Sequence, residues 1–105
     1  MVKCICIDDT NRPEEIPESK WVKLGGIYTI TFIHYHSLQG VMACDLKEIT
    51  LTPECYPFET FKLSRFAFTQ EALIALSELA QACSELNKSD INKAIKELDL
   101  ETVDI

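Results

Sequence analysis

The chain has 105 residues, of which 47% are hydrophobic and 26% are charged, as in an ordinary globular domain with one modest core. Its net charge of −7 disfavours binding to a nucleic-acid backbone, which requires clustered Lys and Arg side chains. No apolar run approaches the roughly 18 residues that cross a bilayer. We therefore expect a single domain over residues 1–105, with neither a nucleic-acid nor a membrane partner.

A first strand is predicted over residues 2–7, where apolar residues precede the pair Asp8 and Asp9. The next segment contains two prolines and many turn-forming residues, so it cannot continue a strand ladder. A second strand is predicted over residues 27–35. Three of its residues form an expected inward row by alternation: Tyr28, Ile30 and Phe32.

A third strand is predicted over residues 41–49, followed by a loop that again contains two prolines. Residues 61–68 then close the β region, which spans residues 1–68. Four or five short strands leave few exposed edges if the sheet curls on itself. The pattern therefore predicts a small, curled, antiparallel β-barrel.

Residues 69–98 contain no Gly, Pro or aromatic residue and predict a helical extension. Thr69 is a suitable N-cap for a first helix, and Ser89 for a shorter second one. The first helix carries an apolar stripe, with Ile74 alone on the opposite face: Leu73, Leu76, Leu79, Ala80, Cys83 and Leu86. The fold class is thus α+β, a β-barrel followed by two helices. Because the stripe is wide, we also predict a homodimer formed through the helical region.

The five cysteines favour a reducing compartment. Their number is odd, whereas secreted disulfide scaffolds usually carry an even set in loops. The segment at the start, Met1-Val2-Lys3-Cys4, also lacks the apolar stretch of a secretory signal. We therefore expect free thiols and a cytoplasmic location, with Cys55 as the one exposed cysteine.

Four segments resemble a family of small uncharacterised proteins encoded by bacteriophages and prophages. The segments read "CICIDD", "VKLGGIYTI", "LKEI" after Gly40, and "FKLSRFAF", and together they lie between residues 4 and 68. The resemblance implies a barrel of the Src-homology-3-like type and implies no particular activity. The positions that match the pattern of the family are Asp8, Asp9, Gly25, Tyr28, Glu48, Arg65 and Phe66.

Two residue pairs could together form a zinc site. His34 and His36 extend the predicted inward row of the second strand, and Cys4 and Cys6 have the same i, i+2 spacing on the first. The alternative is that the cysteines are small core residues and the histidines lie half-exposed at the barrel mouth. Paired zinc ligands are usually separated by about two to four residues. The structural interpretation is therefore favoured, and no metal or cofactor is expected.

Three carboxylates and one arginine have both a chemical and a structural interpretation. Asp8, Asp9 and Glu48 could bind a cation or act as acid and base. Alternatively, one aspartate accepts backbone N–H groups in the following loop, and Arg65 forks onto another carboxylate and closes the barrel. No His, Ser or Lys at a fixed spacing completes a catalytic set, so the structural interpretation is favoured.

Four aromatic residues lie near the loops, Tyr35, Tyr56, Phe58 and Phe61, and the first three are the candidates for a peptide-binding groove. The alternative is that these rings fill the space under a long loop. We therefore predict first a non-enzymatic protein-interaction module of phage or mobile-element origin, which binds another protein or a second copy of itself. The second hypothesis is a small-molecule- or metal-binding regulator that uses the His34 and His36 end of the barrel. The third is an enzyme built on Asp8, Asp9 and Glu48.

Overall fold

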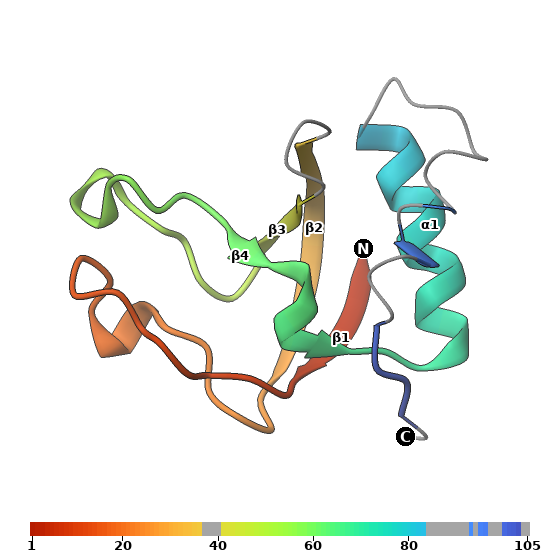
Figure 1. The fold of residues 1–105 in the computed structure, drawn as a ribbon, viewed down its shortest axis with the longest axis horizontal. Helices are drawn as coiled ribbons and strands as arrows, with labels where there is room; N and C mark the ends of the chain where they lie inside the picture. The colour runs from red at the N-terminus through yellow and green to blue at the C-terminus, as the bar shows by residue number, and fades with distance from the viewer. Residues whose placement is uncertain (37–40, 84–92, 94, 97–99, 104–105) are drawn as a thin grey trace.

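The computed structural model describes the chain except for residues 37–40, 84–92, 94, 97–99 and 104–105, and the side chains of Tyr35, His36 and Val41 also lie outside the description. The described residues form a five-stranded antiparallel sheet and one α-helix (Figure 1). The strands are β1 (Val2–Cys6), β2 (Ile27–His36), β3 (Val41–Leu46), β4 (Phe61–Lys62) and β5 (Phe66–Ala67). The helix is α1 (Gln70–Cys83).

The strand order across the sheet is β4-β3-β2-β1-β5. The long strand β2 pairs with β3 on one side and with β1 on the other, and the last strand β5 returns to pair with β1. A short 3-10 turn over Leu63–Arg65 separates β4 from β5. The sheet is thereby curled into a half-barrel, which confirms the α+β class and the antiparallel curled sheet.

The expected inward row of β2 is wrong beyond Ile30. A register shift in the β2–β3 pairing lies between Ile30 and Phe32, so the next buried side chain is Ile33. Phe32 is instead 41% exposed, and its ring lies 4.8 Å from that of His34. The extra residue of a bulge reverses which positions face inward. His34 therefore lies beside Phe32 on the outer face and does not extend the inward row.

The core lies between the curled sheet and α1. Leu76 and Ala80 of the helix are fully buried, and α1 contacts β1 and β2. Thr69 caps the helix as predicted, because its hydroxyl oxygen accepts the Ala72 N–H at 3.0 Å. Ile74, on the opposite face, is 66% exposed. The apolar stripe that suggested a homodimer is thus packed, in part, against the sheet of its own chain.

The second predicted helix falls largely on residues outside the description. Lys93, Ile95 and Lys96 have helical backbone, and Ile95 packs against the core. Farther along, Phe68 forms a parallel bridge with Thr102, with hydrogen bonds of 3.0 Å and 2.9 Å to the flanking Glu101 and Val103. Within the described part of the chain, no helix has the length and apolar character needed to cross a membrane.

Candidate functional site

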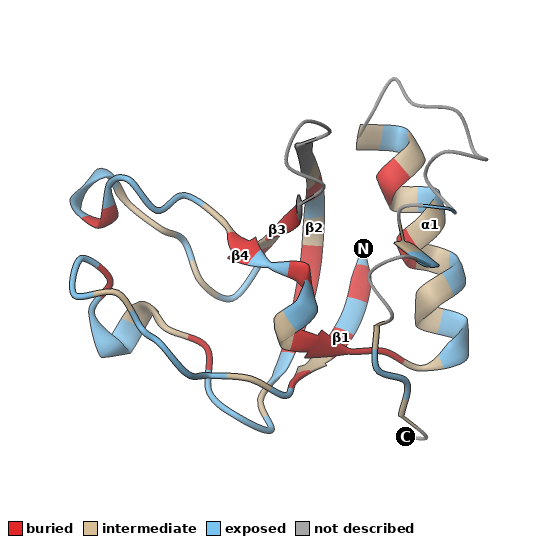
Figure 2. Ribbon diagram, in the orientation of Figure 1, coloured by how far each residue is buried: buried red, intermediate tan, exposed pale blue. Residues whose placement is uncertain are grey.

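Two long loops, residues 7–26 and 47–60, project from the same side of the sheet (Figure 1). The first joins β1 to β2, and the second joins β3 to β4. Most of their residues are exposed or half-buried, whereas the buried residues gather on the strands (Figure 2). Lys20 joins the two loops, since its Nζ donates to the Thr52 hydroxyl at 2.8 Å.

Arg65 anchors the first loop to the turn between β4 and β5. Its Nη1 donates to the carbonyl oxygens of Asp8 at 3.1 Å and Thr10 at 2.8 Å, and lies 3.5 Å from the Asp8 carboxylate. Its guanidinium also lies over the Trp21 ring, 4.7 Å from the centroid. The arginine thus binds mainly backbone carbonyls and an aromatic face, where the sequence predicted a fork onto a carboxylate.

Asp8 and Asp9 organise the start of the same loop. One oxygen of Asp8 accepts hydrogen bonds from the N–H and the hydroxyl of Thr10, which lower the pKa of Asp8 below its ordinary value. Asp9 accepts the Leu24 N–H at 3.2 Å, and its carbonyl accepts the Trp21 indole N–H at 2.7 Å. Both ends of the loop are therefore tied together, and Trp21 is held in place.

The turn before β2 is built around Tyr28. Gly25 has a φ of 82°, a conformation that favours glycine, and a Cβ on Gly26 would lie 2.8 Å from the Tyr28 ring. The Tyr28 hydroxyl accepts the Lys23 N–H at 2.9 Å. This close packing explains the two adjacent glycines and fixes where the first loop rejoins the sheet.

The second loop presents two aromatic side chains to the surface. Tyr56 is 74% exposed and Phe58 is 36% exposed, on either side of a cis peptide bond to Pro57. Cys55, in contrast, is fully buried, so the prediction of an exposed thiol is wrong. A short 3-10 turn over Pro53–Cys55 turns the cysteine inward and the tyrosine outward.

A cleft of about 360 Å³ lies between the two loops. Trp21 and Ile16 line it from the first loop, Phe58 from the second, and Phe61 from β4. The rings of Trp21 and Phe61 are 5.8 Å apart. A second cleft, of about 470 Å³, shares Phe58 and continues along the second loop beside Tyr56. The aromatic side chains therefore line one connected surface.

Of the three residues predicted for a groove, Tyr56 and Phe58 are brought together. The backbone of Tyr35 pairs with Met42 in the hairpin of β2 and β3, and its side chain lies outside the description. Phe61, a further aromatic residue near this loop in the sequence, lines the first cleft with Phe58, whereas Trp21 was not predicted. The signal available for Trp21 was that the single tryptophan of the chain follows a polar, Pro-containing loop.

Glu48 lies apart from the two aspartates. Its carboxylate accepts the Thr29 N–H at 2.7 Å and the Thr29 hydroxyl at 2.8 Å. Burial by itself would raise the pKa of Glu48, but these hydrogen bonds outweigh it and lower the pKa. Thr29 pairs with Lys3 of β1, which lies five residues before Asp8. Five residues span roughly 17 Å along a strand, and this distance separates Glu48 from the aspartates. The three carboxylates thus do not share one site.

The cysteine and histidine pairs also lie apart. Cys4 pairs with Tyr28 of β2, and His34, which pairs with Ala43, lies six residues farther along the same strand. Six residues of a strand span roughly 20 Å, so Cys4 and His34 are far apart. The His34 Nε2 is 3.1 Å from Asp45 Oδ2. Within the described ranges, no three His, Cys, Asp or Glu side chains are arranged to hold a metal, and the side chain of His36 is not described.

The thiols of β1 and β3 are buried and poorly ionised. Desolvation raises the pKa of Cys4 to about 12 and also raises the pKa of Cys44 and of Cys6. A nucleophilic cysteine needs the opposite shift. All five cysteines are free, and Cys83 is the one that is partly exposed.

Comparisons of this chain with protein-family models, with curated proteins and with solved structures find no match.

Proposed function

We propose that the chain is a non-enzymatic protein-interaction module whose connected clefts bind an extended segment of another protein. The observation that carries the proposal is the aromatic surface between the two long loops. Tyr56 and Phe58 are exposed there, beside the half-buried Trp21. Exposed aromatic side chains beside a groove are typical of surfaces that bind extended peptides.

The loops that form this surface are well held, which limits the ordering cost of binding. Arg65 and Asp9 fix the first loop, and the hydrogen bond from Lys20 to Thr52 fixes the first loop to the second. The candidate carboxylates Asp8, Asp9 and Glu48 already accept hydrogen bonds from the chain itself. Their use in these bonds supports a binding function over an acid–base one.

The strand order supports the proposal of a Src-homology-3-like barrel. In that order β1 joins the β2–β3–β4 meander to β5, and a 3-10 turn lies between β4 and β5. The resemblance to bacteriophage and prophage proteins supports an origin in a mobile element, with a host protein as partner. Five free cysteines support a location in a reducing cytoplasm.

The test is a selection from a library of random peptides on the immobilised full chain. Enriched peptides are then synthesised and titrated while the fluorescence of Trp21, the single tryptophan, is followed. We expect saturable binding, with amide shifts in NMR spectra at Trp21, Tyr56 and Phe58. The matched variants are Tyr56→Ser/Phe58→Ser, which removes the exposed rings, and Ile74→Ser, which removes an exposed apolar side chain on α1.

Binding that is lost in Tyr56→Ser/Phe58→Ser and retained in Ile74→Ser supports the proposal. Equal binding by all three proteins, or amide shifts confined to another surface, would refute it. Thermal melts of both variants exclude unfolding as the cause, since the replaced side chains are exposed.

A further inference from the structure

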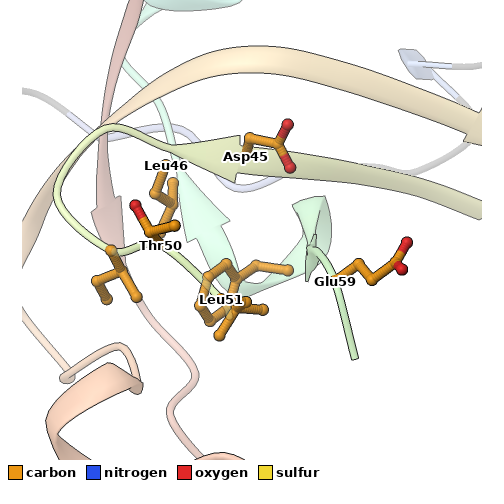
Figure 3. Close-up of a pocket in the computed structure, with 7 residues that line it drawn as sticks. Asp45, Leu46, Thr50, Leu51 and Glu59 are labelled. Carbon is orange, nitrogen blue, oxygen red and sulfur yellow. The ribbon is translucent and has the colours of Figure 1, made fainter. Parts of the chain in front are cut away.

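A third cleft, of about 320 Å³, opens where β3 and β4 separate (Figure 3). β4 pairs with β3 at Ala43 and Cys44, so Asp45 and Leu46 lie beyond its end. The chain before Phe61 diverges from β3 at this point, and Glu59 lines the opposite wall. The cleft is therefore the open continuation of the β3–β4 ladder.

The floor of this cleft is apolar. Leu46 is 5% exposed and Phe61 is 3% exposed, and the half-buried Ile49 and Leu51 complete the floor. Phe61 also lines the cleft between the loops, and Leu51 and Glu59 also line the cleft beside Tyr56. A peptide bound to the aromatic surface can therefore extend into this cleft without leaving the protein.

The rim of the cleft is acidic. Figure 3 shows the carboxylates of Asp45 and Glu59 directed to the same side, away from Leu46 and Leu51. Among the described residues lining the cleft, none is Lys or Arg. One oxygen of Asp45 contacts His34, whereas Glu59 forms no hydrogen bond or ion pair with the described part of the chain.

Three cations of the loops and of the β4–β5 turn are bound elsewhere in the fold. Arg65 binds two carbonyl oxygens of the first loop, Arg12 donates to the Ile16 carbonyl, and Lys20 donates to Thr52. The net charge of −7 for the whole chain also favours a cationic ligand over an anionic one. Its chemistry is complementary to an aliphatic stem that ends in a cation.

We infer that this cleft binds an arginine or lysine side chain of the partner peptide, with its stem on Leu46 and Leu51 and its cationic group between Asp45 and Glu59. The open backbone edge of β3 can also pair with an extended peptide that carries such a side chain. Lys47 donates its N–H to Thr29 of β2 at 2.9 Å, and successive residues turn their backbone groups to opposite edges. The backbone groups of Leu46 thus face the open edge, where an extended peptide can pair. This inference rests on the proposed peptide-binding function.

The test uses two probes that do not depend on the aromatic surface, the amide of N-acetyl-arginine and the amide of N-acetyl-citrulline. Citrulline has nearly the same shape and no charge. We expect saturable amide shifts at Asp45, Leu46, Thr50 and Glu59 with the arginine probe only. Asp45→Asn/Glu59→Gln should weaken its binding about tenfold, as the loss of two partly exposed charge pairs predicts. The control Glu71→Gln/Glu78→Gln changes the net charge equally on α1 and should bind as wild type does.

The peptide selection supplies the second measurement. On wild type, selected peptides should carry Arg or Lys at one position, and on Asp45→Asn/Glu59→Gln that preference should disappear. Peptides that require Tyr56 and Phe58 but show no basic preference would overturn this inference and leave the proposed function standing. Equal shifts with both probes would also overturn it. Arginine-specific shifts without any enriched peptide would instead refute the proposed function and leave the acidic cleft as a site for a cationic side chain.

Discussion

Replacement of Arg65 by alanine should release the first loop from the sheet. The Arg65 side chain is 12% exposed, and its guanidinium binds the carbonyl oxygens of Asp8 and Thr10 while it stacks on Trp21. Alanine removes all of these contacts and leaves two carbonyl groups to be satisfied by water. The backbone of residue 65 can still accept the Ile7 N–H, as it does at 2.8 Å, so the strand pairing itself is kept.

The size of the effect follows from these contacts. Each hydrogen bond from the charged group to a partly exposed carbonyl is worth about 1 kcal/mol, and the stacking on Trp21 adds about 0.5–1 kcal/mol. The ion pair with Asp8 adds little, because that carboxylate is open to solvent. The total is about 2.5–3 kcal/mol of unfolding free energy. For 105 residues this lowers Tm by about 11–14 °C, at an unfolding entropy of about 2.1 cal/mol/K per residue.

The assay is thermal unfolding followed by circular dichroism, with Trp21 fluorescence as a local reporter of the loop. Lys62→Ala is the matched control, since it removes an exposed positive charge from the neighbouring strand and, within the described part of the chain, no hydrogen bond to the loop. Arg65→Lys keeps the charge but loses the planar group that stacks on Trp21, so its Tm should fall between those of wild type and Arg65→Ala. An Arg65→Ala protein with the Tm of Lys62→Ala would refute the reasoning and leave Arg65 as a surface residue.

Four further outcomes are expected. Leu76→Ala should lower the free energy of unfolding in urea by about 2–5 kcal/mol at any protein concentration, because the leucine is buried against its own sheet. A loss that depends on protein concentration would argue for burial between chains. A thiol reagent should modify only Cys83 in the native protein and all five cysteines after denaturation, so rapid native reaction at Cys55 would contradict its burial. The folded-state pKa of Glu48 is lowered, so its stabilising contribution is present above its ordinary pKa of 4.5 and is lost as the pH falls through the folded-state pKa. Glu48→Gln should therefore lose less stability than wild type on acidification. Parallel curves of unfolding free energy against pH for the two proteins would count against this role. The homodimer stays a prediction, which light scattering tests. A dimeric mass that becomes monomeric in Ile74→Glu would place the interface on the exposed face of α1, whereas a monomeric mass for wild type would refute the homodimer.

The amino-acid sequence by itself determined the division into a β region and a helix. Prolines and turn residues mark the two loops, and the absence of Gly, Pro and aromatic residues after residue 69 marks the helical region. The N-cap at Thr69 and the exposed Ile74 were also predictable, because capping and helical periodicity depend on residues within a few positions of each other.

Tertiary structure decided at which residue of β2 the inward-facing side chains shift from the even to the odd positions. The strand pattern was read with a strict period of two, but a bulge depends on the pairing with β3 and carries no local signature here. The same reason explains Cys55, whose loop reads as polar although its 3-10 turn buries the thiol. Arg65 stands out in the sequence, but its carbonyl partners lie 55 and 57 positions away, and only the fold brings them within reach.

The clefts depend on tertiary structure in the same way. Tyr56, Phe58 and Phe61 are predictable from the sequence because they lie in or beside one Pro-containing loop, whereas Trp21 joins them only when two loops project from one side of the sheet. Asp45 and Glu59 lie on one rim because β4 is too short to continue its pairing with β3. Short-range chemistry fixes the elements and their ends, and the binding surface arises where elements distant in the chain stop pairing.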